Sequence, residues 1–224
     1  MLVPRLLETS GIPPRYRDCT LGSFKLAGYT AAAQLPLQEA KERCTQYVYD
    51  FLTPEGHFKQ TGLLLVGPPG TGKTHLAAAV LGALIRRYSL RGRFVDFSSL
   101  INQIQSTFDP SSPESKHDVL DPVMEAELLV LDELGAQNPT PFVKDTLYLI
   151  LNHRYTHRLP TIFTSNFRLE LAQNSNLTST DLLANRLTEA LVSRLYEMAE
   201  VISLDVADFR KARGTKTGKL EASR

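Results

Sequence analysis

The chain has 224 residues, of which 42% are hydrophobic, 8% aromatic and 22% charged. This composition is typical of a folded globular protein with one main domain, and it excludes disordered chains, collagen-like chains and a second large catalytic domain. Lysine and arginine number 25 against 24 aspartates and glutamates, so the formal net charge is +1. This balance argues against a uniformly basic nucleic-acid binder, and any nucleic-acid site must therefore be local.

The sequence predicts a cytoplasmic protein that does not contact a membrane. No stretch reaches the roughly 18 consecutive apolar residues that a spanning helix needs. Pro4, Arg5 and Glu8 stand where a secretory signal would have its apolar run. Cys19 and Cys44 lack the CxxC spacing of metal or disulfide sites, which fits a reducing compartment.

Along the chain, proline and glycine breaks predict an extended N-terminal segment over residues 1–34. Apolar residues at three- and four-residue intervals then predict a helix over 37–52. Five short apolar runs follow, separated by helical patterns. The predicted strands are 63–66, 94–97, 128–131, 162–164 and 201–204, and the predicted helices are 74–88, 99–108, 119–125, 141–158 and 180–198. This alternation indicates an α/β fold in which helices cover both faces of a five-stranded parallel sheet.

Two stretches outside this alternation are strongly polar. Residues 109–118 predict a surface loop, and residues 210–224 carry six basic residues against one glutamate, which predicts a basic flexible tail. The expected domain organisation is therefore an N-terminal segment over 1–34, a main domain over 35–209 and the tail over 210–224.

The strongest motif lies between the first predicted strand and the next helix. It reads GPPGTGKT and matches GxxxxGK[ST], a loop whose backbone N–H groups surround phosphates at the start of a helix. A lysine in this motif reaches the β- and γ-phosphates, and the hydroxyl after it binds Mg²⁺. The candidate residues for ATP are Gly67, Pro68, Pro69, Gly70, Thr71, Gly72, Lys73, Thr74 and the adjoining His75, with Thr74 also a candidate ligand for Mg²⁺.

A second motif places Asp132 and Glu133 directly after the apolar run 128–131. Ligands of parallel α/β sheets bind at the carboxyl ends of the strands, so both carboxylates are expected beside the phosphate loop. We expect Asp132 to hold the Mg²⁺ water shell next to Thr74. Glu133 is the candidate that polarises a water molecule for attack on the γ-phosphate.

Three further residues are candidates with ordinary alternatives. Asn166 follows the run that ends near Thr164, where it can orient the attacking water or simply form a turn. Arg186 and Arg194 lie eight residues apart on an apolar helical pattern. Either arginine can neutralise charge on the γ-phosphate in the transition state, and either can equally be a surface ion pair.

Taken together, these motifs resemble the AAA+ ATPases, and within them the helicase-loader and insertion-sequence helper group of the DnaC and IstB type. The resemblance rests on IPPRYRDCTLGSF (12–24), GPPGTGKTHLA (67–77), LLVLDELG (128–135), LILNHRY (149–155), LPTIFTSN (159–166) and SRLYE (193–197). It implies an AAA+ core without a helical lid domain. It also implies that Asn166 is the sensor and that Arg194 is an arginine finger reaching into the next subunit, with Arg186 as the second choice.

The same resemblance implies an ATP-hydrolysing switch that acts on DNA in replication or transposition. The expected partners are a replicative helicase or a transposase, further copies of the chain in a ring or spiral, and single-stranded or duplex DNA near residues 99–108. Two alternatives stay open: a small-molecule kinase and a nucleotide-dependent interaction module without DNA binding. A kinase needs an arginine-rich lid, and residues 109–118 contain no arginine. The presence of Glu133 argues against a module that does not hydrolyse ATP.

Overall fold

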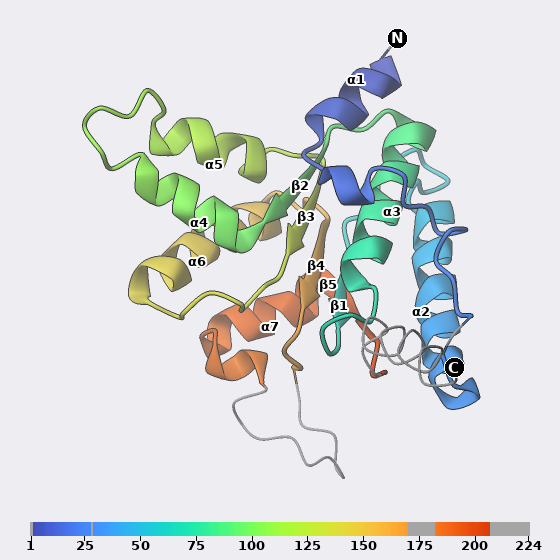
Figure 1. The fold of residues 1–224 in the computed structure, drawn as a ribbon. Helices are drawn as coiled ribbons and strands as arrows, with labels where there is room; N and C mark the ends of the chain where they lie inside the picture. Colours follow the sequence, from blue (N-terminus) through green and yellow to red (C-terminus); the bar gives the residue numbers. More distant parts are fainter. Residues whose placement is uncertain (1, 28, 170–181, 207–224) are drawn as a thin grey trace, which may run out of the picture.

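The computed structural model describes residues 2–27, 29–169 and 182–206. Its centre is a five-stranded sheet in the order β2-β3-β4-β1-β5 (Figure 1). The strands are β1 (Gly62–Val66), β2 (Gly92–Asp96), β3 (Leu128–Asp132), β4 (Thr161–Ser165) and β5 (Ala199–Ser203). All of their pairings are parallel, which confirms the predicted fold class and sheet.

Helices cover both faces of the sheet, as predicted (Figure 1). One face carries α1 (Leu2–Thr9), α2 (Ala31–Tyr49) and α3 (Lys73–Tyr88). The other carries α4 (Phe97–Ser106), α5 (Lys116–Met124), α6 (Pro141–Thr156) and α7 (Glu189–Met198). Short 3₁₀ helices occur at η1 (Pro14–Tyr16) and η3 (Leu183–Asn185). Within the described ranges, no helix combines the length and apolarity needed to cross a membrane.

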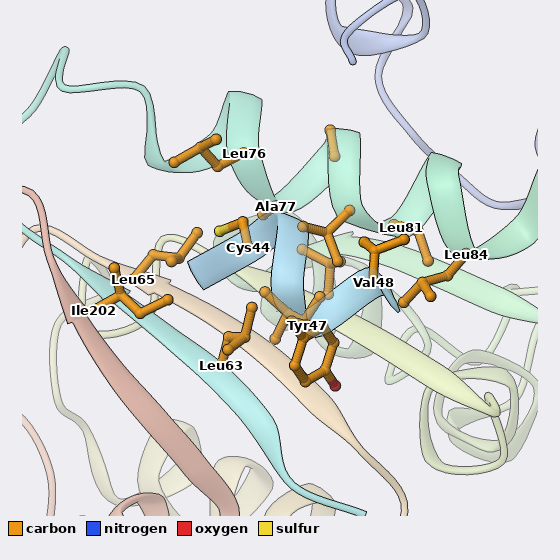
Figure 2. Packing of buried hydrophobic residues seen from close by; sticks show 14 of the residues in the cluster. Cys44, Tyr47, Val48, Leu63, Leu65, Leu76, Ala77, Leu81, Leu84 and Ile202 are labelled. Carbon is orange, nitrogen blue, oxygen red and sulfur yellow. The ribbon is translucent and has the colours of Figure 1, made fainter. Parts of the chain in front are cut away.

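The core consists of two layers because side chains alternate across strand β1, which lies between β4 and β5. Leu63 and Leu65 pack with α2 and α3, whereas Leu64 and Val66 pack with the opposite helices. Figure 2 shows part of the first layer. Its labelled side chains are Cys44, Tyr47 and Val48 from α2, Leu63 and Leu65 from β1, Leu76, Ala77, Leu81 and Leu84 from α3, and Ile202 from β5. Burial raises the pKa of the Cys44 thiol to about 12, so this cysteine behaves as a small apolar side chain.

The N-terminal segment is ordered, and the prediction of an extended chain over 1–34 is wrong. Residues 2–9 form α1, and Leu6 and Leu7 pack against the core beside α3. Pro4 does not break this helix because it lies in the first turn, where the missing N–H group would have had no intrahelical partner. Helix α2 likewise begins at Ala31, before the predicted start.

The chain between α1 and α2 is held against the sheet and α3. The backbone N–H of Phe94 on β2 donates to the carbonyl of Ser10 at 2.6 Å. Ile12 and Phe24 are 5% and 7% exposed and belong to the core layer of α2 and α3. Residues 2–27 therefore pack as part of the main body instead of preceding it.

The predicted helix over 180–198 is also wrong, because the described part of this range contains two separate elements. Helix α7 begins only after Thr188, whose hydroxyl accepts from the backbone N–H of Leu191 and caps it. Arg186 lies in the turn before this cap and Arg194 lies on α7. The two arginines therefore do not share one helical face.

Capping side chains also shift two other boundaries. The predicted strand 94–97 ends at Asp96, whose carboxylate caps the first turn of α4. The predicted loop 109–118 closes early, because Ser115 and Asp118 form a reciprocal capping box that starts α5. The predicted basic tail, residues 210–224, lies outside the described residues.

A buried arginine connects α5 and α6 to the start of β4, at the end of the strands opposite the phosphate loop. Arg154 on α6 has no exposed surface, and its Nε donates to the Thr161 hydroxyl at 2.8 Å. Its other guanidinium nitrogens donate at 2.8–3.1 Å to the backbone carbonyls of Val123, Met124, Ala126 and Pro160. The guanidinium thereby supplies donors to three carbonyls at the end of α5 and just after it, and it shares the Pro160 carbonyl with the backbone N–H of Leu129.

We expect Arg154→Leu to lower the free energy of unfolding by about 3–5 kcal/mol, because the substitution leaves several buried carbonyls unpaired. Urea denaturation measures this loss. Arg87→Leu is the matched control, since Arg87 is exposed on α3 and should change stability little. Equal stability of the two variants would contradict the structural role of Arg154.

Candidate functional site

The phosphate loop, residues 67–72, joins β1 to α3 as the motif predicts. Gly70 and Gly72 have φ values of +79° and +98°, which glycine adopts without the steric cost of a side chain. A Cβ on Gly72 would lie 2.5 Å from the ring of Phe24, so this glycine also leaves room for the N-terminal segment. Since α3 begins at Lys73, its free N–H groups and positive dipole end lie at this loop.

Lys73 is buried, with 6% of its surface exposed. Its Nζ donates to the carbonyls of Gly67 at 2.7 Å and Pro68 at 2.8 Å. A buried ammonium group requires such acceptors. The loop is braced further by Thr71, whose hydroxyl donates to the Pro68 carbonyl at 3.0 Å. The lysine is therefore held inside the loop that a phosphate would enter.

Asp132 connects the phosphate loop to the neighbouring strands. It ends β3 with 6% of its surface exposed, and its Oδ1 accepts from the Thr74 hydroxyl at 3.1 Å and from the Thr164 hydroxyl at 2.5 Å. Burial raises the pKa of Asp132, and the nearby Glu133 and Asp96 add to this effect, while the two hydroxyl donors oppose it. The structure thus brings Thr74 and Asp132 together, as the sequence predicts.

Glu133 is exposed next to this buried carboxylate. Its φ of +59° lies in the left-handed region, which is strained for a residue with a side chain. Its backbone N–H donates to the Thr164 hydroxyl at 3.0 Å, so one hydroxyl fixes both acidic residues. The sequence motifs do not identify Thr164, whose one signal is its place in the Thr-Ser-Asn triplet that ends at Asn166.

A cavity of about 290 Å³ lies in front of these groups. It is lined by Arg15, Tyr16, Pro69, Gly70, Gly72, Lys73, Thr74, His75, Glu133, Thr164 and Asn166. Four predicted residues next to this cavity are not part of its lining. They are Gly67, Pro68 and Thr71 of the phosphate loop, and Asp132, which accepts a hydrogen bond from the lining residue Thr74. The cavity therefore gathers most of the predicted site residues, including Asn166, from three strand ends.

Arg15 and Tyr16 on η1 form a wall of the same cavity, and sequence analysis did not identify them. They lie more than fifty positions from the phosphate loop, in a segment predicted to be extended. The signal was their place in the stretch 12–24, which contributes to the family resemblance. Only the packing of that stretch against α3 shows that these side chains reach the cavity.

The two candidate arginines lie outside the cavity lining. The Arg194 guanidinium stacks 4.6 Å from the ring centre of Tyr148 on α6, and its Nη2 donates to the Tyr148 hydroxyl at 3.3 Å. Its Nη1 is buried and has no hydrogen-bond partner among the described residues. Arg186 stacks 4.6 Å from the ring of Phe167. Neither arginine contributes to the phosphate site of its own chain in this arrangement.

Comparison with known proteins places these features in a wider group. Residues 39–217 match the family described as IstB-like ATP binding protein. The chain is 28% identical over 173 residues to the replicative helicase loader DnaC of Escherichia coli K12, covering 76% of this chain and 64% of that protein. It is also 27% identical over 201 residues to the uncharacterized protein YqaM of Bacillus subtilis, covering 88% of this chain and 57% of YqaM.

A solved structure supports the same grouping. The crystal structure of the DnaC helicase loader superposes with a TM-score of 0.68 at 32% identity, covering 85% of this chain and 99% of that one. The chain spans about three fifths of the length of the full relatives named above. The matched region is the part that contains the sheet, the phosphate loop and the acidic pair.

We expect Asp132→Asn to stabilise the nucleotide-free protein at pH 7 and to raise its Tm. The raised pKa of Asp132 means that folding disfavours its charged form, so wild-type stability falls as pH rises from the unfolded pKa through the folded one. Asparagine removes this loss and still accepts from both hydroxyls. Thermal unfolding from pH 3 to 8 tests this, and a gain that does not grow with pH would contradict it.

Proposed function

The chain belongs to the IstB-like ATP binding protein family, of the AAA+ DnaC/IstB type, and from this membership we propose that it hydrolyses ATP as a switch acting on DNA. The observation that supports the proposal most directly is the single cavity shared by the phosphate loop, Glu133, Thr164 and Asn166. The residues that would bind the phosphates of ATP and those that would activate the water molecule therefore line adjoining walls of one cavity. In this proposal, ATP binding assembles copies of the chain on DNA or on a protein partner, and hydrolysis releases them.

In the proposed reaction, Lys73 exchanges its loop carbonyls for the β- and γ-phosphates of ATP. Glu133 accepts a proton from a water molecule that Asn166 orients, the water oxygen bonds to the γ-phosphorus, and the bond to the β-phosphate oxygen breaks to release ADP. Thr74 and Asp132 would hold Mg²⁺, since their oxygens lie 3.1 Å apart and are the donors this ion prefers. The ion would neutralise phosphate charge.

The proposed partners follow from the relatives. DnaC is a replicative helicase loader by name, and the family is named for IstB. We therefore assign this chain a replicative helicase or a transposase as its protein partner, together with single-stranded or duplex DNA. Further copies of the chain complete the assembly. Arg194 lies on α7 outside the cavity of its own chain, which favours a role at the site of a neighbouring copy.

We expect Lys73→Ala to weaken ATP binding on the order of 100-fold, because the lysine supplies charge to phosphates in a buried loop. Glu133→Gln should bind ATP normally and lower kcat about 10²–10⁴-fold, because the glutamate acts on the water. Calorimetry and phosphate release measure these effects, with Glu55→Gln on an exposed turn as the control. Equal ATP affinity of Lys73→Ala and wild type would refute the site.

We expect Arg194→Ala and Glu133→Gln proteins, each inactive alone, to regain part of the ATPase activity when mixed. Some interfaces in the mixture then combine an intact Glu133 with an intact Arg194 from the other copy. The ATPase rate is followed as a function of mixing ratio, with native mass spectrometry confirming co-assembly. Absence of rescue in a co-assembled mixture would place Arg194 in a role within one chain.

We expect DNA binding to require ATP, to tolerate different sequences and to weaken with salt. A formal charge of +1 allows few phosphate contacts per copy, so useful affinity needs several copies aligned by ATP. The slope of log affinity against log salt on duplex DNA should be about −0.9 for each neutralised phosphate. Fluorescence anisotropy with a slowly hydrolysed ATP analogue measures it. A monomer that does not bind DNA at low salt would contradict this part of the proposal.

A further inference from the structure

His75 follows Lys73 and Thr74 on α3, and its ring contacts the N-terminal segment. Nε2 lies 3.1 Å from the carbonyl of Thr20, and Nδ1 lies 3.4 Å from the Cys19 thiol. A carbonyl only accepts, so Nε2 carries the proton, and Nδ1 accepts from the thiol. Burial raises the pKa of Cys19, which keeps this thiol protonated as a donor. One tautomer of the imidazole therefore satisfies both contacts.

The segment that His75 contacts is braced internally. We call residues 14–24 the cover segment. The backbone N–H of Thr20 donates to the Ser23 hydroxyl at 2.9 Å, and the N–H of Ser23 donates to the Thr20 hydroxyl at 3.0 Å. The N–H of Cys19 donates to the carbonyl of Tyr16 at 3.1 Å. These bonds connect the contacts of His75 to η1, which carries the cavity wall.

The far end of the cover segment is fixed to the same helix start. Phe24 is 7% exposed and lies against Gly72, and its ring meets the His75 ring edge-on with centres 5.4 Å apart. The Ser23 hydroxyl lies 3.3 Å from His75 Nε2. The cover segment is thus attached at two points, Gly72 at the end of the phosphate loop and His75 in the first turn of α3. Arg15 and Tyr16 line the cavity.

We propose that His75 is a positioning residue that holds the cover segment so that Arg15 and Tyr16 form a preset wall of the nucleotide cavity. The proposal rests on the proposed function only in that the cavity takes a nucleotide. A nucleotide that touches both the phosphate loop and this wall binds more tightly when the wall is already in place. Removing the imidazole lets the wall leave the cavity while the phosphate loop stays intact.

The first test measures the affinity for MgADP by calorimetry, which needs no turnover. We expect His75→Ala to weaken binding about tenfold, as the loss of one or two net hydrogen bonds implies. Arg15→Ala alters an exposed wall residue and should also weaken binding. The double variant should bind no more weakly than the weaker single variant, because both changes remove the same wall. His117→Ala, whose side chain is 86% exposed, is the matched control and should bind as wild type.

The double-mutant cycle of His75→Ala and Arg15→Ala distinguishes a positioning role of His75 from a direct contact between His75 and the nucleotide. If the two effects multiply, His75 binds nucleotide independently and the proposal is overturned. Unchanged affinity in His75→Ala or in Arg15→Ala also overturns it. His75→Gln should recover part of the lost affinity, since its amide can still donate to the Thr20 carbonyl. A wild-type protein that binds neither MgADP nor MgATP would instead defeat the proposed function itself.

The two cysteines provide a second readout in the same protein. Cys19 is partly exposed in the cover segment, whereas Cys44 is fully buried in the core. Alkylation by iodoacetamide, located by mass spectrometry, should therefore label Cys19 and leave Cys44 unlabelled unless a variant unfolds. MgADP at ten times its Kd should slow Cys19 labelling about tenfold in wild type. In His75→Ala, MgADP at ten times the Kd of that variant should give Cys19 much less protection than in wild type. Equal protection of Cys19 in the two proteins would overturn the proposal.

Discussion

A buried carboxylate fixes the geometry on which the rest of the site depends. Asp132 is almost fully desolvated, and such a group is tolerated only with hydrogen-bond donors, here the hydroxyls of Thr74 and Thr164. These residues belong to β3, α3 and β4, so satisfying one carboxylate aligns the start of a helix with two strand ends. The phosphate loop ends two residues before Thr74, and Glu133 immediately follows Asp132. Their relative placement is therefore a consequence of this contact.

The site is largely preorganised. Lys73 already lies within the loop, with carbonyl acceptors at 2.7 and 2.8 Å that substitute for the oxygens of a phosphate. Glu133 is held at a strained φ of +59°, with its N–H bonded to Thr164. Strain of this kind persists only where surrounding contacts maintain it, and it is common at functional sites. Groups held in this way need little reorganisation when charge develops on a substrate.

The candidate arginine finger, Arg194, lies outside the lining of the cavity. Arg194 stacks on Tyr148 of α6, and the exposed tyrosines nearby, Tyr148, Tyr155 and Tyr196, keep 42–45% of their surface accessible. Arginine and tyrosine are residues that interfaces favour. This separation supports the proposal that a complete catalytic site requires a second copy. The cover segment adds a further coupling, because it connects the cavity wall to the core through Phe24.

The sequence alone determined the sheet, the phosphate loop and the acidic pair. Buried parallel strands must be short apolar runs, and a phosphate loop needs its glycines, lysine and hydroxyl at fixed spacing, so these features are local in the chain. Tertiary structure alone decided that Thr164 bonds both Asp132 and Glu133, and that Arg15 and Tyr16 line the cavity. It also separated Arg186 from Arg194, because the Thr188 cap outweighed an apolar pattern that continues through the turn. Such contacts join residues far apart in sequence, where periodicity and spacing carry no information about distance.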